Sequence, residues 1–362
     1  MLMEQGSISK YSYNIFCPLW CARTTMFRKS FLYSLLCLLL IMSSCATAEK
    51  NPVTLNIATP PLPRAEVYYE YLLAQHHLRV NQIEKAIKSY HRALSEDPDS
   101  SQLLTELASL YVRQGKIEQA LDLVKKSARM NPEYEAAYML MGQLYAELGK
   151  NDQAINSYKQ VIQLSPSNEN VYLLLGTLYA QDGQFGEAIE MFDRLQELLP
   201  DNPVALYYKG RVFLDMKYYD QAEEIYQQAL ELDPAFDNAL LDLAYIYEVT
   251  GRTSEAEEAY LEILTFNPSN VRAHTRLGNL YMREGKLDEA LEQFGQLVKV
   301  NRKDLESRLK IGIIHFQQKQ YEDAIQDFTH LLKEQREDDQ ALYYLASTYE
   351  ERGDAKQAIL KF

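Results

Sequence analysis

Residues 135–168 read EAAYMLMGQLYAELGKNDQAINSYKQVIQLSPSN. Their first part places apolar and small residues at spacings of three and four, which is one face of a helix: Tyr138, Met141, Gly142 and Tyr145. Gly149 and the polar cluster 150–152 predict a turn that can also cap a following helix. A second helical series comes next and stops before Pro166, which lacks the N–H that a continuing helix needs: Ala154, Ile155, Tyr158, Val161 and Ile162. The stretch therefore predicts two antiparallel helices joined by a short turn.

The same pattern returns along the chain at a fixed period, which is the length of this stretch. An alanine of the second helix recurs at this period: Ala86, Ala120, Ala154, Ala188, Ala222, Ala256, Ala290, Ala324 and Ala358. An aromatic residue stands four positions later in every unit except one, where it is Val124. A proline stands twelve positions after the first six alanines: Pro98, Pro132, Pro166, Pro200, Pro234 and Pro268. A period of this length is typical of stacked units, because one helix pair cannot bury its apolar face alone.

These columns resemble the tetratricopeptide repeat (TPR) family over about residues 67–362, in nine units. The resemblance implies an all-α fold, a right-handed superhelical solenoid of stacked antiparallel helix pairs. Two departures are visible. Tyrosine or leucine stands where the family often has tryptophan early in the first helix, and the last two prolines of the register are replaced by Arg302 and Arg336.

Residues 1–64 have a different character from the repeats. Basic residues after Met26 and the apolar run 31–42 predict a signal peptide over 26–44, too short to span a bilayer. Ser43-Ser44-Cys45 resembles a bacterial lipoprotein signal, which implies lipidation of Cys45 and, with Ala46 after it, an outer-membrane location facing the periplasm. Cleavage after Ala48 and a retained hydrophobic anchor are the alternatives.

Two further segments complete the predicted organisation. Residues 1–25 form an upstream extension with no structural role if translation starts at Met26 rather than Met1. Residues 45–64 contain the lipidation site and a proline-containing tether, and the repeat array occupies 65–362. Phe362 is the aromatic of the ninth unit, so we expect a last repeat that is incomplete in this sequence.

The charge and the cysteine content of the sequence limit the classes of partner and cofactor that we expect. The formal net charge is −14, and an acidic array does not attract phosphate backbones, so we expect no nucleic-acid partner. All four cysteines lie before the repeats, at positions 17, 21, 37 and 45, so no disulfide framework or metal site is expected. The sequence contains no phosphate-binding glycine loop, nucleophile elbow or histidine pair at metal spacing. We therefore predict a protein that is not an enzyme and has no cofactor or small-molecule substrate.

The first helices of such a solenoid line its concave face, where a partner would bind. Positions beside the packing columns carry tyrosine and arginine, which are frequent binding hot spots. The predicted partner-binding residues are Tyr207, Tyr208, Arg211, Tyr245, Arg272, Arg276, Asn279 and Arg283. We expect them to grip an extended peptide or a helix, with Arg272, Arg276 and Arg283 taking acidic groups. The alternative is that these arginines pair with neighbouring acids such as Asp242 and Glu248.

Two specialised uses of the fold are disfavoured. A clamp for a C-terminal carboxylate needs lysine and asparagine where Tyr207 and Asp242 stand. The asparagine ladder of sugar-transferring relatives is absent, since its column contains Glu106, Leu140, Leu174, Tyr208, Asp242 and Arg276. The prediction is a protein-binding scaffold at a bacterial envelope that assists pilus, polysaccharide-export or outer-membrane assembly. The alternatives are a cytoplasmic or membrane-anchored adaptor and the regulatory arm of a glycosyltransferase truncated before its catalytic domain.

Overall fold

The computed structural model describes residues 65–361, which belong to one compact unit. The predicted upstream extension, signal peptide, Cys45 and proline tether lie outside the described residues. Every regular element from 65 to 361 is an α-helix. None of the helices in this range combines the length and the apolarity that crossing a membrane requires.

The helices alternate between the first and the second member of a pair. The first helices are α2 (Ala65–Arg79), α4 (Ser101–Arg113), α6 (Glu135–Glu147), α8 (Glu169–Gln181), α10 (Pro203–Asp215), α12 (Asp237–Val249), α14 (Val271–Glu284), α16 (Leu305–Gln317) and α18 (Asp339–Arg352). The second helices are α3 (Ile83–Glu96), α5 (Ile117–Met130), α7 (Asn151–Leu164), α9 (Phe185–Leu198), α11 (Tyr219–Leu232), α13 (Thr253–Phe266), α15 (Leu287–Val300), α17 (Tyr321–Glu334) and α19 (Ala355–Lys361).

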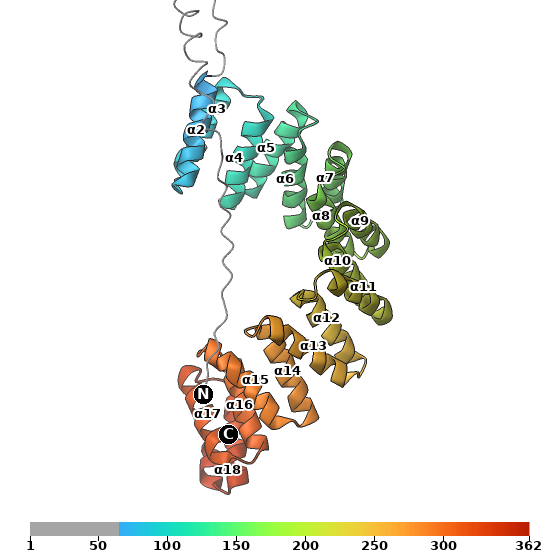
Figure 1. The fold of residues 1–362 in the computed structure, drawn as a ribbon. Helices are drawn as coiled ribbons and strands as arrows, with labels where there is room; N and C mark the ends of the chain where they lie inside the picture. The colour runs from blue at the N-terminus through green and yellow to red at the C-terminus, as the bar shows by residue number, and fades with distance from the viewer. Residues whose placement is uncertain (1–64, 362) are drawn as a thin grey trace, which may run out of the picture. The chain divides into compact units, whose positions relative to one another are not determined.

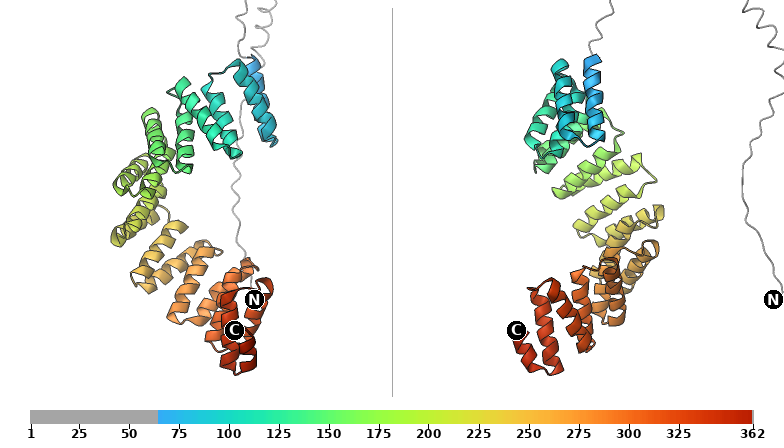
Figure 2. Two further views of the ribbon diagram at one scale, coloured as in Figure 1. Left: turned by 180° about the vertical axis from the view of Figure 1, so that it is seen from behind. Right: turned by 90° about the vertical axis from the view of Figure 1, so that its left-hand side faces the viewer.

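Each pair is a helical hairpin, and the hairpins follow one another in chain order (Figure 1). The two further views show each hairpin beside the next (Figure 2). Each second helix contacts the first helix of the following pair, and first helices of neighbouring pairs also contact one another, as α4 does with α6 and α10 with α12. These contacts confirm the predicted solenoid of stacked antiparallel helix pairs, with the first helices along its inner side.

The small residue of each first helix makes room for an aromatic ring. A Cβ atom added to Gly142 would lie 2.5 Å from Cε1 of Tyr158, and one added to Gly176 would lie 2.6 Å from Cε1 of Phe192. Both rings are almost fully buried, so the two helices of a pair meet over a flat aromatic surface. The glycine and aromatic columns of the sequence are therefore two sides of one contact, repeated along the array.

The turn inside each pair needs a left-handed backbone, for which glycine is suited because it has no Cβ. Six units have glycine there, with φ between 67° and 91°: Gly115, Gly149, Gly183, Gly251, Gly285 and Gly353. Three units keep the same backbone with other residues: Asn81 at φ 56°, Lys217 at 61° and Lys319 at 62°. Asparagine tolerates this region, whereas lysine is strained in it.

The first and the second helices differ in how their N-terminal ends are capped. Polar side chains cap most first helices by accepting a backbone N–H bond: Ser100, Asn168, Asn202, Asn270, Asp304 and Asp338. The second helix α7 begins after Lys150 with no side-chain cap, so the expected capping by the turn cluster 150–152 was wrong. The second helices therefore depend on packing and on the turn rather than on caps.

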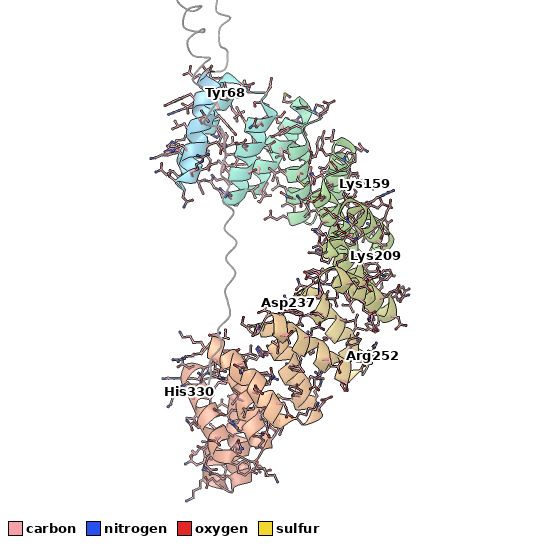
Figure 3. All side chains as sticks on the ribbon, in the orientation of Figure 1. Tyr68, Lys159, Lys209, Asp237, Arg252 and His330 are labelled. Carbon is pink, nitrogen blue, oxygen red and sulfur yellow. The ribbon has the colours of Figure 1, made fainter. Side chains whose placement is uncertain are left out.

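Neighbouring pairs are also joined by a repeated polar contact. Arg252 Nη1 lies 2.6 Å from Glu223 Oε2, and Tyr247 donates its hydroxyl to the same carboxylate at 3.2 Å. Arg252 is labelled in Figure 3, in the turn between α12 and α13. One period later, Lys286 and Tyr281 contact Glu257 at 2.8 and 2.9 Å. This contact ties the second helix of one pair to the turn inside the next pair.

Candidate functional site

Three adjoining hollows open along the first helices from α10 to α18. The first has a volume of about 570 Å³ and lies among α10, α12 and α14, the second about 330 Å³, and the third about 390 Å³. Arg276 lines both the first and the second, and Lys310 lines both the second and the third. The three hollows therefore adjoin one another, and we call them together the first-helix groove.

Most of the predicted partner-binding residues line this groove. Arg211, Tyr245, Arg272 and Arg276 line the first hollow. Asn279 and Arg283 join Arg276 in the second. The structure thus brings together six residues that the sequence analysis selected from three different first helices.

Tyr207 is not among them, and its expected exposure was wrong. Its side chain is buried, with 8% of its surface exposed, and its ring centroid lies 5.2 Å from that of Phe236. Arg211 Nη1 donates to the Tyr207 hydroxyl at 3.3 Å. The register alone does not explain the burial, because Leu241 and Leu309 of the same column are buried whereas Tyr343 is 57% exposed. Tyr207 therefore belongs to the packing between first helices.

Tyr208, the next residue, is half-buried and lines none of the three hollows. Its ring stacks on Phe192 of the preceding second helix, with centroids 5.7 Å apart and planes 27° apart. Much of its surface is thus committed to packing between neighbouring units, so Tyr208 offers a partner less than the sequence analysis expected.

The arginines divide into two groups. Arg283 pairs with Glu248, and Nε of Arg211 lies 3.7 Å from Oδ2 of Asp242, as the intramolecular alternative predicts. Arg272 and Arg276 have no acidic oxygen of the described residues within 4.0 Å. The Arg276 guanidinium instead lies 5.8 Å from the ring centroid of Tyr245, within the range of a cation–π contact. These two guanidinium groups are therefore available to an incoming anion.

Asp242 is the partly buried acid of the first hollow. Tyr226 donates its hydroxyl to Asp242 Oδ2 at 3.2 Å. Burial raises the pKa of Asp242, and the nearby Arg211 and the hydroxyl of Tyr226 oppose that rise. The carboxylate form of Asp242 is therefore less favourable here than in water, which limits the negative charge that this side of the hollow holds.

Two cations of the groove are not among the predicted partner-binding residues. Lys217 lines the first hollow and Lys310 lines the second and third. Lys310 follows Arg276 by one period, so extending the ladder column by one unit finds it. Lys217 occupies the turn-glycine column, and a non-glycine residue there was the available signal. With these two residues the groove is more basic than the predicted set suggested.

The described range holds no cluster of metal-ligating side chains, and one of its histidines is buried between helices. Within 65–361, no three or more His, Cys, Asp or Glu side chains form a group that could hold a metal ion. His274 is buried, and its ring nitrogens lie 2.8 Å from Gln293 Oε1 and 3.0 Å from the Pro268 carbonyl. These contacts assign His274 to the packing of α14 on α15.

Models of repeat families match successive parts of the chain. Tetratricopeptide repeat models match residues 72–144, 169–212 and 207–271, and a TPR repeat model matches 142–183. A model described as the cilia and flagella-associated protein 70 middle TPR-like domain matches 240–361. Together these matches run without a gap over most of the described array.

Two solved structures, both of repeat proteins, give the same result for the fold. A tetratricopeptide repeat protein from Parabacteroides merdae is 18% identical over 69% of this chain and 98% of its own, with a TM-score of 0.52. The C-terminal part of a TPR repeat-containing protein from Cytophaga hutchinsonii is 16% identical over 66% and 97%, with a TM-score of 0.54. A MamA protein is 27% identical over 48% and 96%, with a TM-score of 0.40. No curated protein sequence matches this chain. The described part of the chain is therefore an array of tetratricopeptide repeats.

Proposed function

We propose that this protein is a non-enzymatic scaffold that binds another polypeptide along the first-helix groove. The observation that supports this most directly is the row of adjoining hollows, which share Arg276 and Lys310 and extend over five first helices. An elongated groove suits an extended chain, because successive side chains of the ligand meet successive repeats. Repeats of this class generally serve as protein-interaction scaffolds.

The composition of the groove also suits a polypeptide. Cations, amides and aromatic rings all line it, as with Arg276, Asn279 and Tyr344. Arginine and tyrosine contribute most at protein interfaces because they combine apolar contact with directed hydrogen bonds. Such a surface can hold both the backbone and the side chains of a bound segment.

Within this proposal, the place of action is the bacterial envelope. The support is the leader: an apolar run followed by Ser43-Ser44-Cys45, with a proline-containing stretch before the first repeat. A lipid on Cys45 ties the array to the outer membrane, and the array faces the periplasm. There it assists the assembly of an envelope structure, such as a pilus, a polysaccharide exporter or outer-membrane machinery.

The binding role can be tested with a photo-crosslinking amino acid placed at Tyr245. Tyr245 is 37% exposed in the groove, and Leu261 on the second helix α13 is 41% exposed and serves as the matched control position. After irradiation of cells that produce each full-length variant, we expect discrete adducts from position 245 and few from position 261. Equal adducts from both positions, or none from 245, would contradict the proposal.

The envelope location needs a separate experiment. Cells are labelled with a radioactive fatty acid while producing the wild type, Cys45→Ala or Cys37→Ala. We expect label in the wild type and in Cys37→Ala, and its loss in Cys45→Ala, because only the cysteine of the lipoprotein-like motif would be acylated. Label that persists in Cys45→Ala, or is absent from the wild type, excludes the proposed anchor.

A further inference from the structure

Lys217 combines backbone strain with a place in the groove. It lies between α10 and α11 with φ at 61°, where six other units use glycine. A side chain costs free energy in this left-handed region because its Cβ approaches the backbone closely. Residues held in such conformations are often found at functional sites. An independent observation is needed before a function is assigned to any one of them.

The surroundings of Lys217 supply that observation. Four cations line the first hollow, Arg211, Lys217, Arg272 and Arg276, against two acids, Asp215 and Asp242. The hollow thus holds a net charge of +2 when all six are ionised. Residues 1–64 contain six basic and two acidic side chains, a net charge of +4, so residues 65–362 carry −18 when the whole chain carries −14.

A net positive hollow in so acidic an array indicates an anionic ligand. Like charges gathered without partners repel one another, and a bound anion relieves this repulsion. Arg272 and Arg276 lack an acidic oxygen within 4.0 Å, and the same holds for Lys217 among the described residues. Guanidinium groups bind carboxylates in a planar two-point geometry, and a lysine adds a mobile point charge.

We propose that the first hollow is a specificity site for acidic side chains of the bound polypeptide, and that Lys217 is one of the cations that recognise them. This rests on the proposed scaffold function and names the chemistry of its ligand. Leu214, Leu241 and Tyr245 also line the hollow, so an apolar residue of the ligand lies beside its acidic ones.

A nucleic acid fits this hollow less well than an acidic peptide. Its backbone carries a charge at every nucleotide, and it would meet Asp215, Asp242 and the acidic array beyond the hollow. A peptide can present two or three carboxylates to the cations and neutral residues elsewhere. The hollow therefore matches a short anionic cluster rather than a continuous polyanion.

Lys319 provides a control for strain within the same chain. It occupies the turn column three units after Lys217, with φ at 62°, and it lines none of the three hollows of the groove. Lys217→Gly and Lys319→Gly make the same chemical change and relieve the same backbone strain. They differ in whether a cation of the first hollow is removed.

The test begins with a phage library of random twelve-residue peptides selected on the full-length protein. We expect enriched peptides to contain clustered Asp or Glu beside an apolar residue. The affinity of the best peptide is then measured by fluorescence anisotropy for the wild type and both variants, together with its Glu→Gln form and a single-stranded oligonucleotide. We expect Lys217→Gly to weaken binding about three- to five-fold and Lys319→Gly to leave it unchanged.

Each outcome has a distinct meaning. No enriched peptide at all contradicts the scaffold function itself. Enriched peptides without acidic residues, or equal affinity of the Glu and Gln forms, overturn the acidic specificity alone. Equal losses of affinity in both glycine variants, or no loss in Lys217→Gly, would show that Lys217 is not part of the site. Tighter binding of the oligonucleotide than of the peptide would show that the ligand is a nucleic acid. Melting temperatures at or above that of the wild type verify that both variants are folded.

Discussion

The first helices α6 and α8 differ from α14 and α16 at the position two residues before the small residue. Leu140 and Leu174 stand there in the earlier pairs, half-buried and packed against their neighbours. Arg276 and Lys310 stand there in the later pairs and line the first-helix groove. The packing column itself is glycine in all four helices, and each glycine faces a buried aromatic ring.

This difference separates the part of a repeat that makes the fold from the part that is free to vary. The glycine–aromatic contact is the same in both regions, so the backbone of the repeat is the same. The position two residues before the glycine is not part of this contact between the two helices, and so it can be occupied by an apolar residue or by a cation. Binding properties can therefore change along the array without changing the fold.

The largest expected effect tests the shared packing. Phe192 and Phe294 occupy equivalent positions in the two regions, and each is 1% exposed over a glycine. Phe192→Ala and Phe294→Ala each leave a cavity, and we expect each to lower the free energy of unfolding by about 3–5 kcal/mol. Urea unfolding followed by circular dichroism measures this loss.

The control for that experiment is Glu224→Ala on the exposed surface of α11, which we expect to change the free energy of unfolding by less than about 0.5 kcal/mol. Similar losses for Phe192→Ala and Phe294→Ala support the comparison. A loss confined to one of the two would mean that the two regions are not held together by the same contact.

The next effect concerns the column that differs. The double variant Arg272→Glu/Arg276→Glu reverses two cations that have no ion pair, so we expect affinity for acidic peptides to fall at least about ten-fold. Lys85→Glu/Lys88→Glu on α3 changes the net charge equally at two exposed positions far along the sequence from the groove. Fluorescence anisotropy should show little change for that control. Equal losses in both double variants would indicate general repulsion in place of local recognition.

The periodic part of this structure is predictable from the sequence. Packing depends on columns such as Gly142 with Tyr158, which recur at a fixed spacing and so reveal themselves without coordinates. Tyr207 was misassigned because its own residue type suggested a hot spot, and its column does not decide the matter, since Leu241 is buried and Tyr343 is 57% exposed. The burial of Tyr207 comes with its contact to Phe236, which the periodic pattern does not show.

The state of the arginines was not predictable in the same way. Arg283 pairs with Glu248 and Arg211 with Asp242, and both pairs join first helices of neighbouring units. Arg276 has equally plausible acidic neighbours in the sequence but pairs with none of the described residues within 4.0 Å. Which partner a long side chain reaches depends on rotamers and on competing contacts, and a periodic pattern carries no information about these.

Asp242 gives a smaller effect with a defined pH dependence. Because burial raises its pKa in the folded protein, the folded state binds this proton more readily than the unfolded state. Stability from this group therefore decreases as pH rises through its titration range and is regained on acidification. Asp242→Asn should abolish this contribution and, by adding one unit of positive charge to the hollow, should strengthen binding of an acidic peptide at pH 7 a few-fold.

Thermal unfolding of wild type and Asp242→Asn between pH 4 and 7, with peptide affinity at each pH, checks both parts. Asp122→Asn on the exposed surface of α5 is the control, since it makes the same change outside the groove. A wild type that loses stability from this group on acidification would show that the pKa of Asp242 is lowered rather than raised. Unchanged affinity would place Asp242 outside the electrostatic reach of the ligand.

The smallest effect compares turns of the two ends of the array. Asn81 and Lys319 both occupy the glycine column with positive φ. The left-handed backbone makes lysine less stable in the folded state by roughly 1–2 kcal/mol, whereas glycine costs about 0.5–1 kcal/mol because it has greater freedom in the unfolded chain. Lys319→Gly should therefore raise the free energy of unfolding by about 0.5–1 kcal/mol. Asparagine adopts the left-handed region readily, so Asn81→Gly should change it by a few tenths at most. Equal gains in the two variants would mean that the turn itself is strained whatever residue occupies it, and the special status argued for lysine in this column would be lost.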